Sequence, residues 1–170
     1  MFHYHELMPG HSVTLAGTGL SAVAYPLSHG GVESTAFLVR SGSDAMLYLG
    51  DTGPDTVEHS HDLEALWKEV APLIRAHELH GIIIECSYDN SRSDKQLYGH
   101  MTPAWLLREL TSLRMTAGVP MKDFPVLVSH IKPSLTAGLP AEARIKAQLD
   151  AGNADGFRFI IARQGMNVVF

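Results

Sequence analysis

The chain has 170 residues, of which 45% are hydrophobic and 18% are charged, and its formal net charge at pH 7 is -5. A chain of this size can bury a sizeable core, so we expect one domain over residues 1–170, and the scattered charges argue against nucleic acid or an anionic membrane as a partner. No stretch approaches the roughly 20 apolar residues of a membrane span, and the first residues lack the parts of a signal peptide.

The first 50 residues are predicted to be rich in β-strands. Short apolar or alternating runs occupy residues 13–15, 22–25 and 36–40, and a further apolar run occupies residues 45–49. Gly and Ser residues separate these runs, which is typical of strands joined by tight turns.

Residues 51–170 are predicted to alternate between helix and strand. Apolar residues spaced by three and four predict a helix from Asp62 to about His77, with Pro72 at a kink. Thr102 before Pro103 has the pattern of an N-cap followed by proline in the first turn, which predicts a second helix. The remaining predicted elements are strands at 81–87 and 125–129, a helix at 140–149 closed by Gly152, and terminal strands at 157–162 and 167–170.

The predicted order from residue 45 is β-α-β-α-β-α-β-β, which favours an α/β layer architecture. In such folds the functional residues gather where the strands end and the loops converge. Three candidate metal ligands stand at such places: His29, Asp51 and His130 each follow a strand-like run. Imidazole and carboxylate suit zinc, manganese or iron, and a carboxylate can bridge two ions. Any one of these histidines alone is more simply a loop residue bonded to backbone, but all three together favour a metal site.

Two alternatives for the segment around Asp51 stay open. Asp51-Thr52-Gly53 matches the short triplet of aspartic proteases, although those enzymes are nearly all β. The segment could also be a plain turn in which the carboxylate bonds to the backbone.

Other histidines are weaker candidates. His59 and His61 stand just before a predicted helix, where polar residues commonly fill cap positions, and His3 and His5 lie at a terminus that is expected to fray. We therefore interpret these four as structural or surface residues.

Two further residues indicate a site for an anion. His100 stands just before a helix N-terminus, where free amides and the helix dipole favour phosphate, and Lys132 follows His130 closely. We expect both to bind substrate.

Seven motifs occur together in an order typical of one family. They are PLSHG at 26–30, STAFL at 34–38, YLGDTGPD at 48–55, LW with APLI at 66–74, IECS at 84–87, LYGHMTP at 97–103 and VSHIKP at 128–133. In these motifs the chain resembles the class II 3′,5′-cyclic-nucleotide phosphodiesterases, a branch of the metallo-β-lactamase superfamily.

The resemblance implies a four-layer αββα sandwich with two metal ions, most simply zinc, that hydrolyses cyclic AMP or cyclic GMP to the 5′-nucleotide. It implies that His29 binds one metal, that Asp51 bridges both and is catalytic, and that His130 binds the second. His100 would contact the phosphate or protonate the departing 3′-oxygen, and Lys132 would bind the substrate. A metal-bound hydroxide would attack phosphorus, so no Ser or Cys nucleophile is needed.

The family's His-x-His-x-Asp-His motif is absent from this sequence. We therefore expect the chain to correspond to the C-terminal half of the fold, with an incomplete metal site and a partner that is either an N-terminal half or a second copy. The alternatives are another hydrolase of the superfamily, acting on an RNA phosphodiester or a lactam, and a non-catalytic remnant that binds nucleotide or oligomerises. A single cysteine, Cys86, suits the cytoplasm, and a missing first half leaves the periplasm open.

Overall fold

The computed structural model describes residues 6–133 and 138–170. Its strands are β1 (Ser12–Leu15), β2 (Leu20–His29), β3 (Val32–Ser41), β4 (Asp44–Leu49), β5 (Leu79–Glu85), β6 (Pro125–Ser129) and β7 (Arg158–Ile161). Its helices are α1 (Asp55–Glu58), α2 (Asp62–Arg75), the 3-10 turn η1 (Asp94–Gln96), α3 (Pro103–Ala117) and α4 (Ala141–Gly152).

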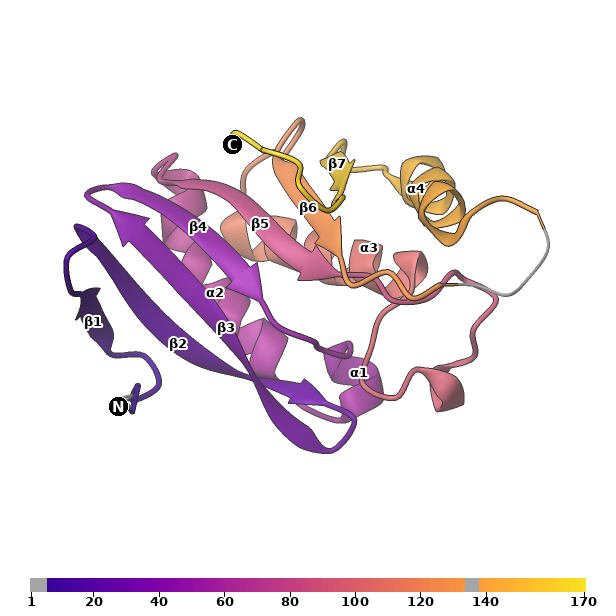
Figure 1. Cartoon of the computed structure of the whole chain (residues 1–170), viewed down its shortest axis with the longest axis horizontal. Coiled ribbons are helices and arrows are strands. Elements are labelled where there is room, and N and C mark those ends of the chain that lie inside the picture. The colour runs from indigo at the N-terminus through magenta and orange to yellow at the C-terminus, as the bar shows by residue number, and fades with distance from the viewer. Residues whose placement is uncertain (1–5, 134–137) are drawn as a thin grey trace.

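The strands form one mixed sheet in which the spatial order follows the sequence, from β1 at one edge to β7 at the other (Figure 1). Strands β1 to β4 pair antiparallel through short turns. Strands β4 to β7 pair parallel, and helices form the crossovers between them. The predicted α/β architecture is therefore confirmed.

Helices α2 and α3 cover one face of the sheet, and α4 lies beside β7 (Figure 1). Apolar side chains alternate along strands β2 to β7, so one side of each of these strands is buried beneath the helices, as Leu47, Ile82 and Val126 illustrate at 0% exposure. With the apolar stripes of α2 and α3 they form one contiguous cluster of buried side chains. None of the described helices is long and apolar enough to cross a membrane.

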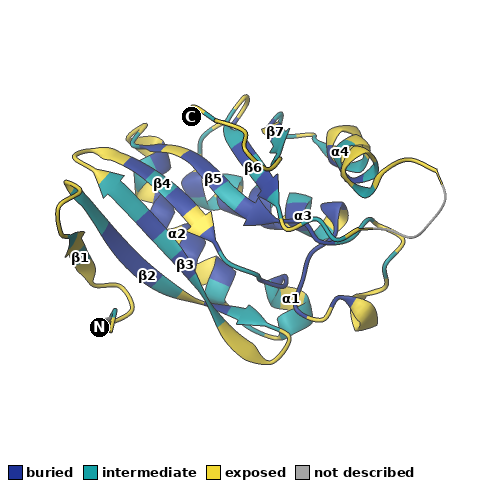
Figure 2. Ribbon diagram, in the orientation of Figure 1, coloured by how far each residue is buried: buried dark blue, intermediate teal, exposed yellow. Residues whose placement is uncertain are grey.

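The opposite face carries a row of apolar side chains in register across five strands. Each member pairs with the next, and all are partly exposed (Figure 2). We call this row the open-face row: Phe37, Tyr48, Ile83, Leu127 and Ile160. The C-terminal segment runs over this face (Figure 1), and the ring of Phe170 packs against Gly81 where a larger side chain would collide with it.

Two features of the predicted secondary structure are wrong. Residues 167–170 form no strand, because their backbone pairs with no neighbour among the described strands; the Phe170 ring packs on Gly81, whereas Val169 is 89% exposed. The order from residue 45 is β-α-α-β-α-β-α-β, since the short helix α1 precedes α2. Strand propensity depends on the available partner, which the sequence of a segment does not contain.

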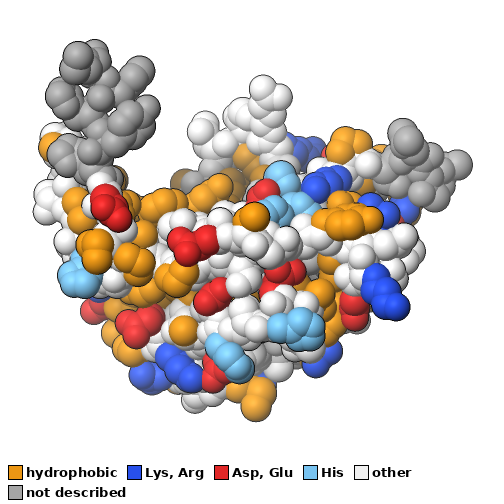
Figure 3. All heavy atoms as spheres, turned by 90° about the horizontal axis from the view of Figure 1, so that it is seen from below, with side chains coloured by type: hydrophobic (Ala, Val, Ile, Leu, Met, Phe, Trp, Pro, Cys, Tyr) orange, Lys and Arg blue, Asp and Glu red, His pale blue; other side chains and the backbone are white. Residues whose placement is uncertain are grey.

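Strand direction decides where the functional residues lie. Because β2 and β4 both pair antiparallel with β3, they run in the same direction, and β5 and β6 run parallel to β4. The C-terminal ends of β2, β4, β5 and β6 therefore lie on one side of the molecule. Figure 3 views the molecule from below and shows histidine side chains at several places on this face, one of them beside acidic and basic side chains.

Candidate active site

His29, Asp51 and His100 form a compact group at the strand ends. Each offers one ligand atom, and these atoms all lie within 4.8 Å of one another. Within the described part of the chain, this is the one group of three or more such side chains that could hold a metal ion. Its donors, two imidazoles and a carboxylate, suit zinc or another divalent metal.

Both histidines of this group are oriented through their Nδ1 atoms. His29 Nδ1 lies 2.8 Å from the carbonyl oxygen of Gly99, and His100 Nδ1 lies 2.6 Å from Oε1 of Glu85. A carbonyl or a carboxylate can only accept, so Nδ1 carries the hydrogen in each ring. Nε2 of each ring is then left with a lone pair, which is the form that binds a metal.

Glu85 is the buried partner that fixes His100. The residue is 1% exposed, and the backbone N–H of Thr52 also donates to its Oε1 at 3.0 Å. The Ser87 hydroxyl donates to its Oε2 at 2.6 Å. A carboxylate at the end of β5 thereby joins the segment after Asp51 to the loop that carries His100. The sequence indicated Glu85 only as a member of the predicted strand at 81–87 and of the IECS motif, since its burial was not visible there.

His130 completes the cluster from the end of β6. Its Nε2 lies 3.3 Å from Oδ2 of Asp51, and its ring centroid lies 5.3 Å from that of His100. Its φ of 55° is in the left-handed region, which residues other than glycine adopt rarely and which often marks functional positions. All three predicted metal ligands therefore lie together, with His100 among them.

Lys132 also faces the cluster. Its Nζ donates to Nε2 of His100 at 2.7 Å, which places a positive charge beside the candidate ligands. The backbone N–H of Lys132 donates to the Ser87 carbonyl at 3.0 Å, so this loop is tied to the end of β5.

Two glycines let the loops that carry His29 and His100 touch. A Cβ atom on Gly99 would stand 2.2 Å from the backbone nitrogen of Gly30 and 2.6 Å from Nδ1 of His29. Glu58 of α1 braces the same turn, because its Oε2 accepts a hydrogen bond from the Gly30 N–H at 2.7 Å. The centroids of the His29 and His100 rings lie 4.6 Å apart as a result.

Other sequence candidates lie outside this cluster. His61 precedes α2, where its Nδ1 lies 3.0 Å from Oε2 of Glu64, and His59 is the C-cap of α1. His3 and His5 lie outside the described residues. Burial raises the pKa of the Cys86 thiol well above its ordinary value, which keeps it protonated and unreactive. The mixed sheet does not fit the mostly β aspartic proteases.

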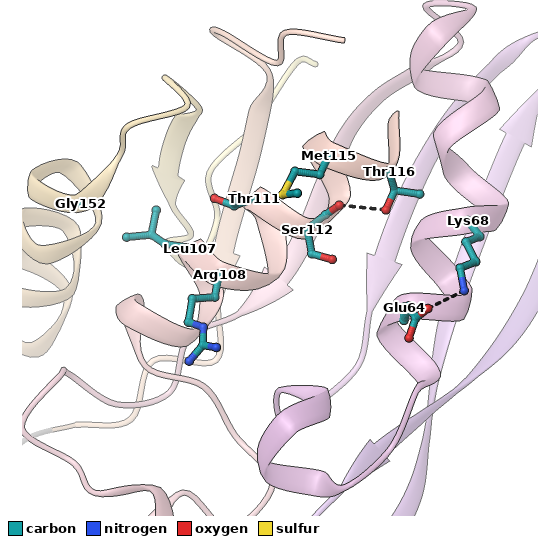
Figure 4. Close-up of a pocket in the computed structure, with 9 residues that line it drawn as sticks. All are labelled: Glu64, Lys68, Leu107, Arg108, Thr111, Ser112, Met115, Thr116 and Gly152. Carbon is teal, nitrogen blue, oxygen red and sulfur yellow. Dashed lines mark hydrogen bonds and ion pairs between the residues drawn. The ribbon is translucent and has the colours of Figure 1, made fainter. Parts of the chain in front are cut away.

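A groove of about 740 Å³ lies among the helices on the covered side of the sheet (Figure 4). Its wall includes Arg108 and Met115 from α3, together with Glu64 and Lys68, which form an ion pair along α2. It shares no lining residue with the histidine cluster and contains no cluster of metal-donating side chains among the described residues. We find no chemistry to assign to it.

Comparison with known proteins gives consistent matches. A family model for class II cAMP phosphodiesterases matches residues 11–165. A probable 3′,5′-cyclic-nucleotide phosphodiesterase of Yersinia pestis is 43% identical over 166 residues, which is 96% of this chain and 48% of that protein. A 3′,5′-cyclic-nucleotide phosphodiesterase of Aliivibrio fischeri is 42% identical over 171 residues, which is 99% of this chain and 52% of that protein. The chain thus spans about half the length of these curated relatives.

Two solved structures are similar to this chain in fold. The crystal structure of unliganded yeast PDE1 superposes with a TM-score of 0.84 at 28% identity, over 94% of this chain and 48% of that chain. The metallo-β-lactamase fold protein YhfI of Bacillus subtilis superposes with a TM-score of 0.61 at 17% identity, over 94% of this chain and 53% of that chain. At that identity, the second match supports the fold alone.

Proposed function

Because the chain belongs to the class II cAMP phosphodiesterase family, we propose that it acts in the metal-dependent hydrolysis of 3′,5′-cyclic AMP or cyclic GMP to the 5′-nucleotide. The observation that carries this proposal is the group of His29, Asp51 and His100, whose ligand atoms lie within 4.8 Å of one another at the strand ends. The donor types fit a divalent metal, and the neighbouring Lys132 suits an anionic substrate.

In this proposal His29 would hold one metal ion, His130 would hold a second, and Asp51 would be a ligand shared by both. Zinc fits the imidazole and carboxylate donors best, and manganese or iron would also fit. When bound, such ions neutralise charge on the phosphate and lower the pKa of a water nucleophile.

His100 and Lys132 are assigned to the substrate phosphate. Glu85 holds the His100 ring so that Nε2 faces the cluster, where Lys132 also points. We propose that Lys132 binds a phosphate oxygen and that His100 contacts the phosphate or the departing 3′-oxygen. The position of His100 beside His29 and Asp51 also makes it a candidate ligand of the first metal.

The site of this chain offers fewer ligands than two metal ions require. At about four ligands each, two zinc ions need more donors than His29, Asp51, His100 and His130 supply. We propose that a second polypeptide segment, either the remaining half found in the longer relatives or a second copy, completes the site. The open-face row supports this proposal, because exposed apolar rows commonly mark contact surfaces.

The test is cyclic AMP hydrolysis with added zinc or manganese, by the chain alone and together with the other half of the Yersinia pestis relative. We expect slow or no turnover alone and a large gain with the added half. The Asp51→Asn variant should lose this gain and bind zinc at least tenfold more weakly, whereas Asp44→Asn, which alters an exposed Asp–His pair at the opposite end of β4, should not. Absence of turnover in every mixture would contradict the proposal.

Assays on the same protein samples distinguish two other candidate functions. A panel with an RNA phosphodiester and a lactam tests for another hydrolase of the superfamily. Calorimetry with cyclic AMP in chelator tests for a non-catalytic nucleotide-binding module, which the small number of ligands in this chain favours. Tight binding without metal and without turnover would support that second function.

A further inference from the structure

A separate cavity opens beside the histidine cluster. It encloses about 380 Å³, within the range of sites that hold small molecules. The loop after β5 forms one wall, with Tyr88, Arg92 and Gln96, and the first turns of α4 form the other, with Ala141 and Ile145.

The two walls are held in place by polar contacts. Arg144 of α4 forms an ion pair with Asp89 at 2.7 Å, and the side chain of Gln148 accepts a hydrogen bond from the Asn90 N–H at 2.9 Å. The hydrogen bond from Ser91, followed by the neighbouring Arg144, lowers the pKa of Asp89, so this anchor stays ionised near neutral pH. The cavity is therefore formed before any ligand arrives.

The cavity borders the histidine cluster, because two of its lining residues contact residues of the cluster. Lys132 lines it and also donates to His100 Nε2 at 2.7 Å. Ser87 lines it as well and bonds to Glu85 at the centre of the cluster. A molecule with an anionic group at the cluster can thus extend past Lys132 into the cavity.

Tyr88 lines the cavity, contacts both His100 and Arg92, and presents an aromatic ring. Its ring centroid lies 5.9 Å from that of His100, and the Arg92 guanidinium lies 4.1 Å from it on a cation–π contact. Aromatic rings and guanidinium planes are the groups on which nucleic-acid bases stack.

We infer that this cavity binds the base of the nucleotide, stacked against the Tyr88–Arg92 pair, while the phosphate lies toward Lys132. This inference rests on the proposed function and names the part of the protein that recognises the nucleoside. Ala141, which lies beside the buried Ile145, provides apolar contact for the base, and Gln96 provides hydrogen-bonding groups at its edge.

The test compares two probes that differ only by the base, 5′-AMP and ribose 5-phosphate, by calorimetry on the full chain with zinc present. We expect 5′-AMP to bind at least tenfold more tightly. Tyr88→Leu and Arg92→Ala should each reduce the ratio of the two affinities. Complete loss of stacking would reduce this ratio by roughly 5- to 150-fold. Tyr88→Phe should keep it, because the ring remains.

Arg108→Ala is the matched control. Arg108 makes the same kind of contact with Trp105, at 4.4 Å, and neither residue lines the cavity. This variant should keep the ratio of the unaltered chain. The backbone N–H of Tyr88 bonds to the Met101 carbonyl, so changes to the Tyr88 ring leave that tie intact. Thermal unfolding of each variant reports any general loss of structure.

Equal affinity for the two probes in the unaltered chain, or no binding of either, would overturn the inference. So would a ratio that survives both Tyr88→Leu and Arg92→Ala. Cyclic AMP turnover is measured separately, in the mixture of this chain with the other half of the Yersinia pestis relative. A base-dependent affinity ratio in this chain together with no turnover in that mixture leaves the inference standing and counts against the proposed function. Turnover in the mixture without a base-dependent ratio supports the proposed function and overturns the inference.

Discussion

Glu85 is a buried residue that orients the candidate site without being one of its candidate ligands. Its carboxylate accepts hydrogen bonds from Thr52, Ser87 and His100, so it holds three segments and one imidazole tautomer at once. Such outer partners of metal-binding histidines typically contribute about 10- to 100-fold to metal affinity or activity.

Glu85→Gln is expected to lower zinc affinity by about 10- to 100-fold. Glutamine keeps an acceptor oxygen for His100 but removes the negative charge that makes the imidazole a stronger metal ligand. Zinc titration by calorimetry measures the effect. Glu78→Gln, which alters a surface ion pair with Arg40, is the control. An unchanged zinc affinity in Glu85→Gln would contradict the assignment of Glu85 as a positioning residue.

At the scale of elements, the site depends on the contact between the β2–β3 turn and the loop before α3. Gly99 has φ of +83° and lies against Gly30, whereas Gly118, at the end of α3, has φ of +68° and open space within 4 Å of the position that a Cβ atom would take. Alanine would have a strained backbone conformation at either position, but only at Gly118 is there space for its Cβ atom.

Gly99→Ala is therefore expected to cost more than Gly118→Ala in the free energy of unfolding. We expect about 1 kcal/mol for Gly118→Ala from backbone conformation, and about 1–3 kcal/mol more for Gly99→Ala from overpacking. Urea unfolding measures both. Gly99→Ala should also weaken zinc binding, because it displaces His29 from His100. Equal losses in the two variants would show that the close contact has no importance.

The interface of α2 and α3 contains a second buried carboxylate. Glu109 is 8% exposed and accepts a hydrogen bond from Trp67 Nε1 at 3.4 Å. Burial, and then the nearby charge of Asp55, raise the pKa of Glu109 above its ordinary value of 4.5. The folded state thus holds this proton more tightly than the unfolded state does.

This pKa shift predicts how stability depends on pH. The contribution of Glu109 is fully favourable below pH 4.5 and is lost as the pH rises from 4.5 through the higher folded pKa. Glu109→Gln should therefore become more stable relative to the unaltered chain as the pH rises from about 4 to about 7. Urea unfolding across this range measures the difference, with Glu142→Gln in the exposed first turn of α4 as control. A difference that does not change with pH would contradict the prediction.

At the scale of the whole molecule, one face of the sheet is covered by helices and the other carries the open-face row. Apolar rows of this kind favour association. In the absence of a partner segment we expect the chain to self-associate through this face, and Tyr48→Lys should reduce that association. Sedimentation velocity at several concentrations measures it. Met115→Lys changes an exposed apolar side chain on α3, on the covered side of the sheet, and should have no such effect. Identical behaviour of the two variants would count against the open-face row as the contact.

The sequence alone determined most of the local structure and the family. Apolar periodicity and turn residues identified nearly every strand and helix, because these signals are local, and the ordered motifs around His29, Asp51, His100 and His130 correctly identified the class II phosphodiesterase family. The tertiary structure decided the rest. Only strand order and direction bring these residues to one side of the sheet, only burial reveals Glu85 as the partner of His100, and only packing explains why the C-terminal residues form no strand. Each of these depends on contacts between segments far apart in the chain, which no local pattern records.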